Sequence, residues 1–66
     1  MNIKVNGEIK EFKDNITLGE LIDDLGIKDK VMASAVNMEI VKKDSWESYI
    51  LKSDDVIELL DFVGGG

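Results

Sequence analysis

A single helix is the feature that most limits the folds open to this 66-residue chain. A capping box opens it, with Thr17 as the N-cap and Glu20 three residues later, so that each side chain accepts the backbone N–H of the other residue. Its apolar residues then recur at i, i+3, i+4 and i+7, as on one face of a helix: Leu18, Leu21, Ile22 and Leu25. Gly26 follows at the position where a left-handed residue commonly ends a helix. The sequence therefore predicts one helix over residues 17–25.

Strand-like segments lie on both sides of this helix. Residues 1–5 alternate between apolar and polar, and the dipeptide Asn6-Gly7 is typical of a tight type I′ hairpin turn, so residues 8–13 are expected to return as a second strand. Phe12 is out of phase with Ile9, which predicts a bulge or a strand end near Glu11. Three further strands are predicted at residues 31–36, 40–41 and 56–63.

The segment at residues 31–36 has the composition of a central strand. Residues 31–36 are apolar on both faces apart from Ser34. The small side chains of Ala33 and Ala35 are expected to let the helix approach the sheet closely. Trp46, in an irregular segment further along, is expected to cover one end of the core.

One helix on one face of a mixed sheet is an α+β architecture. If the first and last strands pair in parallel at its centre, the arrangement is a β-grasp, a mixed sheet of four to five strands packed on the one helix. Alternation along the last strand assigns Ile57 and Leu59 to the core. Leu60 and Phe62 share the opposite face with Glu58 and are candidates for an exposed apolar patch. We expect a β-grasp domain over residues 1–63, followed by a flexible glycine tail over residues 64–66.

The composition argues against several classes of function. The chain has no cysteine and no histidine, and its eight basic residues are all lysines. It therefore lacks thiolate chemistry, the commonest general base and the bidentate phosphate clamp of arginine. A net charge of −6 argues against nucleic acid as a partner, because binding to phosphates needs a basic surface. With no transmembrane run and no signal-peptide core, we expect a cytoplasmic protein without a metal site, a membrane partner or enzymatic activity.

Three consecutive glycines follow the last apolar strand. Glycine adds no side chain to a core and loses the most conformational entropy on ordering. Gly64, Gly65 and Gly66 are therefore better explained by a reaction at the end of the chain than by packing. We hypothesise that the Gly66 carboxylate is the reactive group of the protein.

Taken together, these features resemble the ThiS family of thiamine-biosynthesis sulfur carriers, and the resemblance covers essentially the whole chain. The motifs that carry it are Thr17-Leu18-x-Glu20-Leu21, Ala35-Val36-Asn37-x-x-Ile40-Val41, Trp46, and the ending Asp55-Val56-Ile57-Glu58 … Phe62-Val63-Gly64-Gly65-Gly66. Members of the family are small ubiquitin-like β-grasp proteins.

The resemblance implies a protein cosubstrate that is not itself an enzyme. A ThiF-type adenylyltransferase would adenylate Gly66, the partner of Gly65 in the terminal pair, and the resulting thiocarboxylate would give its sulfur to the thiazole ring assembled by a ThiG-type thiazole synthase. No cofactor would be bound, since the partner enzyme uses ATP and Mg²⁺, and the protein alone would be a monomer. Three alternatives stay open: a sulfur carrier for molybdopterin or tungstopterin, a ubiquitin-like modifier, and a non-covalent β-grasp interaction module.

A docking face is expected beside the tail. Leu60, Phe62 and Glu58 are the candidate contacts, although ordinary sheet surface is an open alternative because single exposed apolar residues are common. The acidic residues of this region are expected to meet basic residues of a partner and to raise the rate and specificity of association: Asp54, Asp55, Glu58 and Asp61. A solvated turn and strand edge is the open alternative for this acidic group.

Overall fold

Five strands, one α-helix and one 3-10 helix make up the part of the chain, residues 1–61, that the computed structural model describes. In chain order they are β1 (Asn2–Val5), β2 (Glu8–Glu11), α1 (Leu18–Asp24), β3 (Val31–Val36), β4 (Glu39–Val41), the 3-10 helix η1 (Lys43–Ser48) and β5 (Val56–Asp61). Residues 62–66 lie outside the described residues. The end of the last strand at residue 63 and the flexible tail over residues 64–66 therefore stay predictions.

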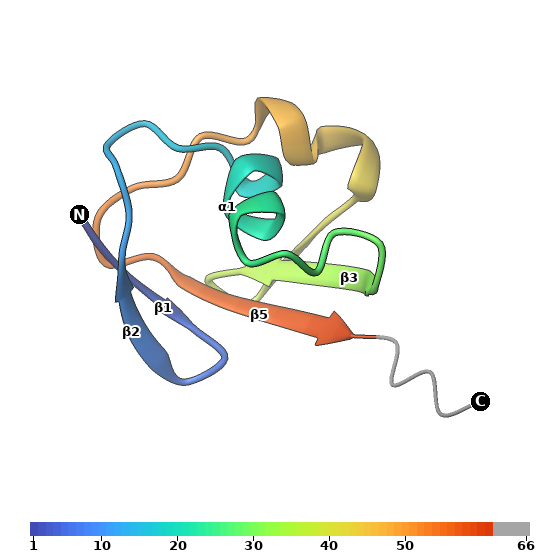
Figure 1. Cartoon of the computed structure of the whole chain (residues 1–66), viewed down its shortest axis with the longest axis horizontal. Coiled ribbons are helices and arrows are strands. Elements are labelled where there is room, and N and C mark those ends of the chain that lie inside the picture. The colour runs from blue at the N-terminus through green and yellow to red at the C-terminus, as the bar shows by residue number, and fades with distance from the viewer. Residues whose placement is uncertain (62–66) are drawn as a thin grey trace.

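The strands form one mixed sheet in the order β2-β1-β5-β3-β4. The central strand, β5, runs parallel to β1 and antiparallel to β3, and α1 lies on one side of the sheet (Figure 1). The predicted β-grasp is therefore confirmed. The strand that leads toward the glycines has a neighbouring strand on each side.

Both hairpins turn through left-handed residues. Asn6 has φ 48° and Gly7 has φ 87°, as the predicted type I′ turn requires. The β3–β4 hairpin repeats this arrangement with φ 51° at Asn37 and 72° at Met38. The prediction of a strand end near Glu11 is also confirmed, because β2 ends there and Phe12 turns into the core.

The caps of α1 determine where it begins and ends. The Thr17 hydroxyl accepts the Glu20 N–H at 3.1 Å and the Glu20 carboxylate accepts the Thr17 N–H at 2.9 Å, which completes the capping box. At the other end Leu25 is the C-cap, and Gly26 adopts φ 72°. The helix thus runs from Leu18 to Asp24, one residue shorter at each end than predicted.

The core lies between α1 and the sheet. Its fully buried apolar side chains come from every layer of the fold: Ile3, Leu18, Leu21, Ile22, Val36, Trp46 and Ile57. Trp46, on η1, is 1% exposed and donates its indole N–H to the Val41 carbonyl at 3.0 Å. The prediction that Trp46 covers the core is therefore confirmed.

The orientation of β3 is where the sequence interpretation is wrong. Ser34 pairs directly with Leu59, and because paired residues share a face of the sheet, the Ser34 side chain points into the core. Ala33 and Ala35 therefore face away from α1 and do not mediate its approach. The β3–β5 register shifts between Val31 and Ala33, a bulge that alternation alone does not show.

Candidate functional site

The two faces of β5 differ in burial. Ile57 and Leu59 are 0% and 7% exposed in the core, as predicted. Glu58 and Leu60 point to the opposite, open face, where Leu60 keeps 62% of its surface exposed. Phe62, the third predicted docking residue, lies outside the described residues.

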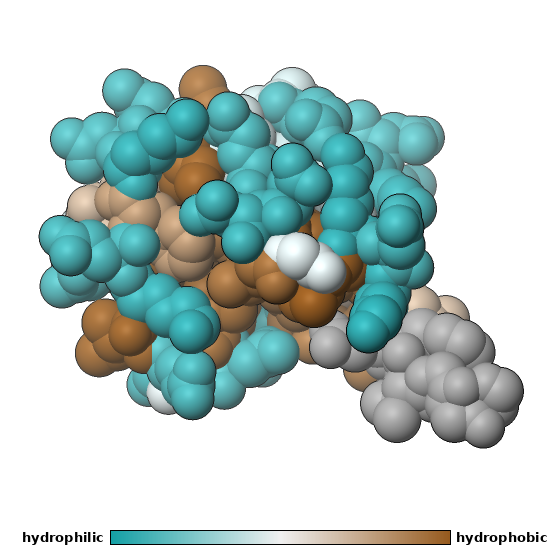
Figure 2. Space-filling view, viewed as in Figure 1, coloured by the Kyte–Doolittle hydropathy of each residue, from teal (hydrophilic) through white to brown (hydrophobic). Residues whose placement is uncertain are grey.

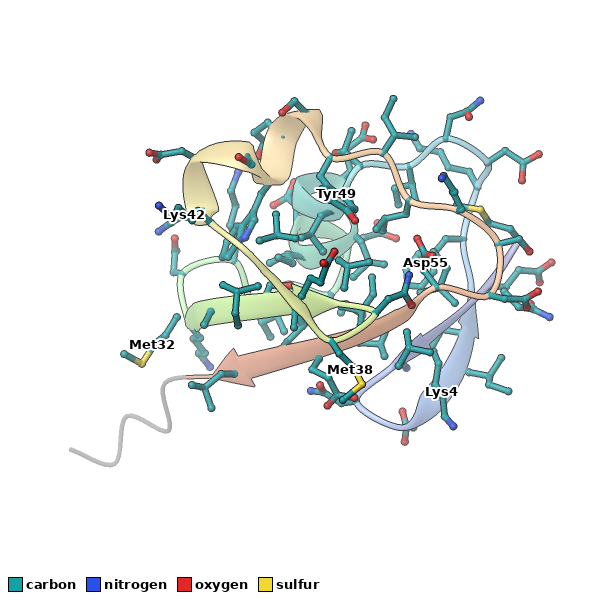
Figure 3. All side chains as sticks on the ribbon, turned by 180° about the vertical axis from the view of Figure 1, so that it is seen from behind. Lys4, Met32, Met38, Lys42, Tyr49 and Asp55 are labelled. Atoms are coloured by element: carbon teal, nitrogen blue, oxygen red, sulfur yellow. The ribbon has the colours of Figure 1, made fainter. Side chains whose placement is uncertain are left out.

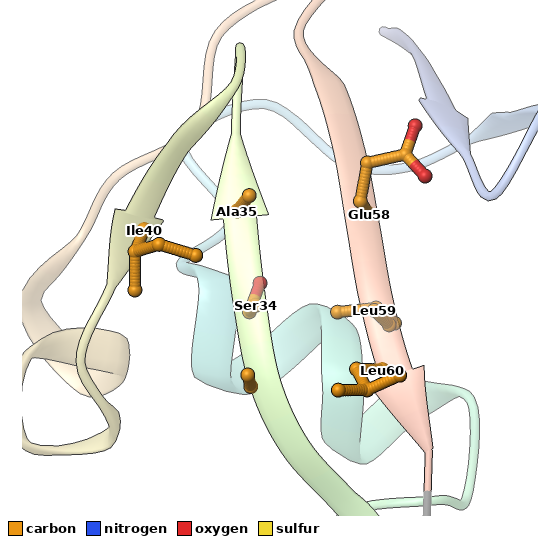
Figure 4. Close-up of a pocket in the computed structure, with 7 residues that line it drawn as sticks. Ser34, Ala35, Ile40, Glu58, Leu59 and Leu60 are labelled. Atoms are coloured by element: carbon orange, nitrogen blue, oxygen red, sulfur yellow. The ribbon is translucent and has the colours of Figure 1, made fainter.

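An open apolar groove runs along this face beside Leu60. Its volume is about 260 Å³, and it is lined by Ala33, Ser34, Ala35, Ile40, Glu58, Leu59 and Leu60. Figure 4 shows the Ile40 and Leu60 side chains directed toward one another across β3, with α1 behind the sheet. Because Ala33 and Ala35 are small, the groove stays open between Ile40 and Leu60. The sequence instead assigns the two alanines to the close approach of the helix.

Sequence reasoning missed Ile40, Ala33 and Ala35 as members of the site. For Ile40 the sequence did contain an indication. Ile40 precedes the buried Val41 on an edge strand, so its side chain points to the opposite face of the sheet from the core. The two alanines could be assigned only after the register of β3 with β5 was known, since the bulge reverses the simple alternation.

The open face continues beyond the groove toward β1 and β2. Lys4 pairs with Ile9 on one side and with Val56 on the other, so the three side chains share this face. Lys4 points away from α1 (Figure 3). A second hollow of about 200 Å³ lies here, lined by Asn2, Ile3, Lys4, Ile9, Asp54 and Val56.

Exposed apolar side chains are concentrated at the sheet. In Figure 2, hydrophilic residues cover most of the visible face and hydrophobic residues emerge between them. Of the large apolar residues that the structure finds exposed, four lie on the open face: Ile9, Ile40, Val56 and Leu60. Exposed apolar side chains that share one face of a sheet are candidates for a protein–protein contact.

The acidic residues near β5 do not act as one group. Asp55 is buried, and its carboxylate accepts the Asn37 amide at 3.0 Å and the Lys52 N–H at 2.8 Å, at the start of β5 (Figure 3). The expectation that Asp55 meets a partner is therefore wrong, because its carboxylate accepts hydrogen bonds within the turn before β5. Asp54 and Glu58 are exposed, while the side chain of Asp61 is not among those described.

Residues 1–61 show neither a metal site nor a membrane-spanning helix. No group of three or more metal-ligating side chains in this range is placed to hold an ion. Over the same residues, no helix is long and apolar enough to cross a membrane. The candidate site is an open groove on the β-grasp sheet, beside the strand that leads toward the glycines.

The fold and this face define a small β-grasp protein with an open, partly apolar sheet face. Comparison with known proteins then gives its family. The chain belongs to the ThiS family, whose model matches residues 3–66.

Similar proteins fall into two groups by length. The chain is 34% identical to the sulfur carrier protein ThiS of Bacillus subtilis, covering 97% of this chain and 98% of that protein. It is 29% identical to ThiS of Escherichia coli over the full length of both. It is also 33% identical to a thiazole synthase of Paramagnetospirillum magneticum, but there it spans only 20% of the longer protein.

A solved structure shares the fold over its whole length. The crystal structure of the thiamine biosynthesis protein ThiS from Geobacter metallireducens matches with a TM-score of 0.82 and 27% identity, covering all of both chains. The predicted fold and the predicted family are therefore both confirmed.

Proposed function

We propose that this protein is a sulfur carrier of thiamine biosynthesis. The observation that carries the proposal is the match to the ThiS family over residues 3–66, together with the likeness to two sulfur carrier proteins along nearly their entire length. The Gly66 carboxylate is the proposed site of reaction, with Gly64 and Gly65 as the arm that presents it. All three glycines lie outside the described residues.

The chemistry proceeds in two steps. An ionised α-carboxylate, with a pKa of about 3.3–3.7, is a poor electrophile at neutral pH. One carboxylate oxygen attacks the α-phosphorus of ATP and releases pyrophosphate, which leaves an acyl-adenylate. A sulfur nucleophile at the level of sulfide then attacks the acyl carbon and displaces AMP, which leaves a terminal thiocarboxylate.

The machinery for both steps belongs to the partner. A ThiF-type adenylyltransferase would bind ATP and Mg²⁺ and supply the catalytic groups. This division of labour is consistent with the absence of histidine, cysteine and arginine from the whole chain. The carrier contributes its carboxylate and a surface by which the enzyme recognises it.

A thiazole synthase of the ThiG type is the proposed acceptor of the sulfur. Its support is that two bacterial thiazole synthases match the chain along a fifth of their own length. A carrier-like region within the same polypeptide as the synthase is consistent with a working contact between the two.

The groove on the open face is the proposed docking surface for these enzymes. Leu60 and Ile40 offer apolar surface, and Glu58 at the rim offers a charge for a basic partner residue. Phe62 would extend the same face toward the tail. Three side-chain-free residues span at most about 10 Å when extended, which suits a narrow channel leading to an enclosed active site.

The test is the formation of the thiocarboxylate. The protein is incubated with a ThiF-type adenylyltransferase, ATP, Mg²⁺ and sulfide, and its intact mass is measured. We expect one oxygen to be replaced by sulfur, and a matched chain lacking Gly66 to stay unmodified while keeping its circular dichroism spectrum and thermal midpoint. If the full chain stays unmodified beside a carrier that the same enzyme converts, the proposal is contradicted.

A further inference from the structure

Two asparagine side chains bind the backbone of β5 from opposite sides. Asn6 and Asn37 are each the first residue of a hairpin turn, and both are left-handed, with φ 48° and 51°. The Asn37 side-chain oxygen accepts the Val56 N–H at 2.9 Å, at the start of β5. The Asn6 side-chain oxygen accepts the Leu59 N–H at 2.8 Å, close to the end of the described strand.

Asn6 extends the parallel ladder beyond the end of β1. The Asp55 carbonyl accepts the Lys4 N–H at 3.0 Å, and the Ile57 carbonyl accepts the Asn6 N–H at 2.9 Å. The next carbonyl in this series, that of Leu59, accepts the side-chain amide of Asn6 at 3.3 Å. The side chain therefore takes the place of the next residue of β1, which has already turned away into the hairpin.

The other side of β5 becomes irregular just after Leu59. The register with β3 shifts between Val31 and Ala33, opposite Asp61 and Leu60. The two hydrogen bonds between Asn6 and Leu59, one donated by each residue, are the last hydrogen bonds described between β5 and the β1 hairpin. In the sequence, Leu59 precedes Gly66 by seven residues.

We propose that Asn6 is a positioning residue that holds β5 at Leu59 from the β1 side, and with it the end of the strand that leads to the arm carrying Gly66. The inference rests on the proposed function, since it concerns delivery of the Gly66 carboxylate to the adenylating enzyme. Without the Asn6 amide, Leu59 loses both of its hydrogen bonds on the β1 side. The enzyme must then order additional backbone, and ordering one more residue lowers kcat/KM about 5- to 30-fold.

The chain provides a matched control in Asn37. Replacement of either asparagine by glycine keeps the left-handed turn, because glycine adopts positive φ without a steric penalty, and removes the amide contact to β5. Asn6→Gly removes the contact at Leu59, near the end of β5, whereas Asn37→Gly removes the contact at Val56, at the start of the strand. Asn6→Asp is a third variant that keeps an acceptor for the Leu59 N–H and loses the donor.

The experiment compares reactivity, stability and amide exchange across these variants. ATP–pyrophosphate exchange with a ThiF-type adenylyltransferase gives kcat/KM, thermal melting gives stability, and hydrogen exchange by NMR reports the Leu59 and Val56 amides. We expect Asn6→Gly to lower kcat/KM about 5- to 30-fold and to speed exchange at Leu59. Asn6→Asp should fall between Asn6→Gly and wild type. Asn37→Gly should speed exchange at Val56 and lower the thermal midpoint, with kcat/KM near that of wild type.

The outcomes separate the two levels of the proposal. If wild type supports no exchange of pyrophosphate, the proposed function fails, and the positioning role fails with it. If wild type reacts and Asn6→Gly reacts equally well, only the positioning role is overturned. Equal losses of kcat/KM in Asn6→Gly and Asn37→Gly would indicate a general effect of stability, which also overturns it. Should Asn6→Gly fail to fold, unchanged kcat/KM and Leu59 exchange in Asn6→Asp would contradict the role.

Discussion

Neighbouring leucines on β5 allow docking to be tested separately from folding. Leu59 is 7% exposed in the core and Leu60 is 62% exposed in the groove. We predict that Leu60→Ala weakens binding to the ThiF-type adenylyltransferase and leaves the fold intact, whereas Leu59→Ala destabilises the fold. Ile50, which is 57% exposed and does not line the groove, provides a control substitution of similar exposure.

The magnitudes follow from these exposures. Complete burial of a leucine side chain contributes about 1.5–3 kcal/mol, and the 62% of Leu60 that is still exposed leaves about 1–2 kcal/mol to be gained on docking. Loss of that amount weakens binding about 5- to 30-fold. Leu59→Ala instead removes buried methyl groups and lowers the free energy of unfolding by about 2–5 kcal/mol.

Isothermal titration calorimetry gives the dissociation constants, and urea unfolding gives the stabilities. Leu60→Ala and Ile50→Ala should each change the free energy of unfolding by no more than about 0.5 kcal/mol, and only Leu60→Ala should weaken binding. If Leu60→Ala binds as tightly as wild type, the docking surface lies elsewhere. If Ile50→Ala weakens binding as much, the groove has no special part in it.

Two further predictions concern stability. Ser34 Oγ is buried and has no hydrogen-bond partner in residues 1–61, so Ser34→Ala should raise the free energy of unfolding by about 1–2 kcal/mol. The exposed control Ser48→Ala should change it by no more than about 0.5 kcal/mol. A loss of stability in Ser34→Ala would refute this prediction. The hydrogen bond from the Thr17 N–H, and then the charge of Lys13, hold the pKa of Glu20 below its ordinary value. The ionised Glu20 carboxylate therefore stabilises the fold at a pH above this ordinary pKa, and the stabilisation is lost as the pH falls through the lower pKa of the folded state. Wild type should therefore lose more stability between pH 7 and pH 3 than Glu20→Gln does, and equal losses in urea unfolding would contradict the assignment.

Local signals predicted the fold where neighbouring residues determine the structure. The capping box at Thr17 and Glu20, the Asn6-Gly7 turn and Gly26 each specify a backbone conformation within a few residues. The core positions Ile57 and Leu59 followed from alternation along a regular strand. These features depend on residues close in the sequence, and the structure confirms them.

Features that depend on pairing between distant segments could not be predicted in the same way. The bulge between Val31 and Ala33 decides which way Ser34 points, and it depends on the register with β5. The sequence predicts Asp55 to be a surface charge, because nothing near it in the chain indicates its hydrogen bonds with Asn37 and Lys52. The Asn6 contact with Leu59 joins residues 53 positions apart.

The most direct test of the account is the mass of the C-terminal peptide after reaction. Following treatment with the ThiF-type adenylyltransferase, ATP, Mg²⁺ and sulfide, the protein is cleaved and the fragment ending in Gly66 is analysed by tandem mass spectrometry. We predict that one oxygen of the Gly66 carboxylate is exchanged for sulfur, and that the exchange disappears when ATP is omitted. An unmodified Gly66 beside a converted control carrier, or sulfur attached at any other residue, would contradict it.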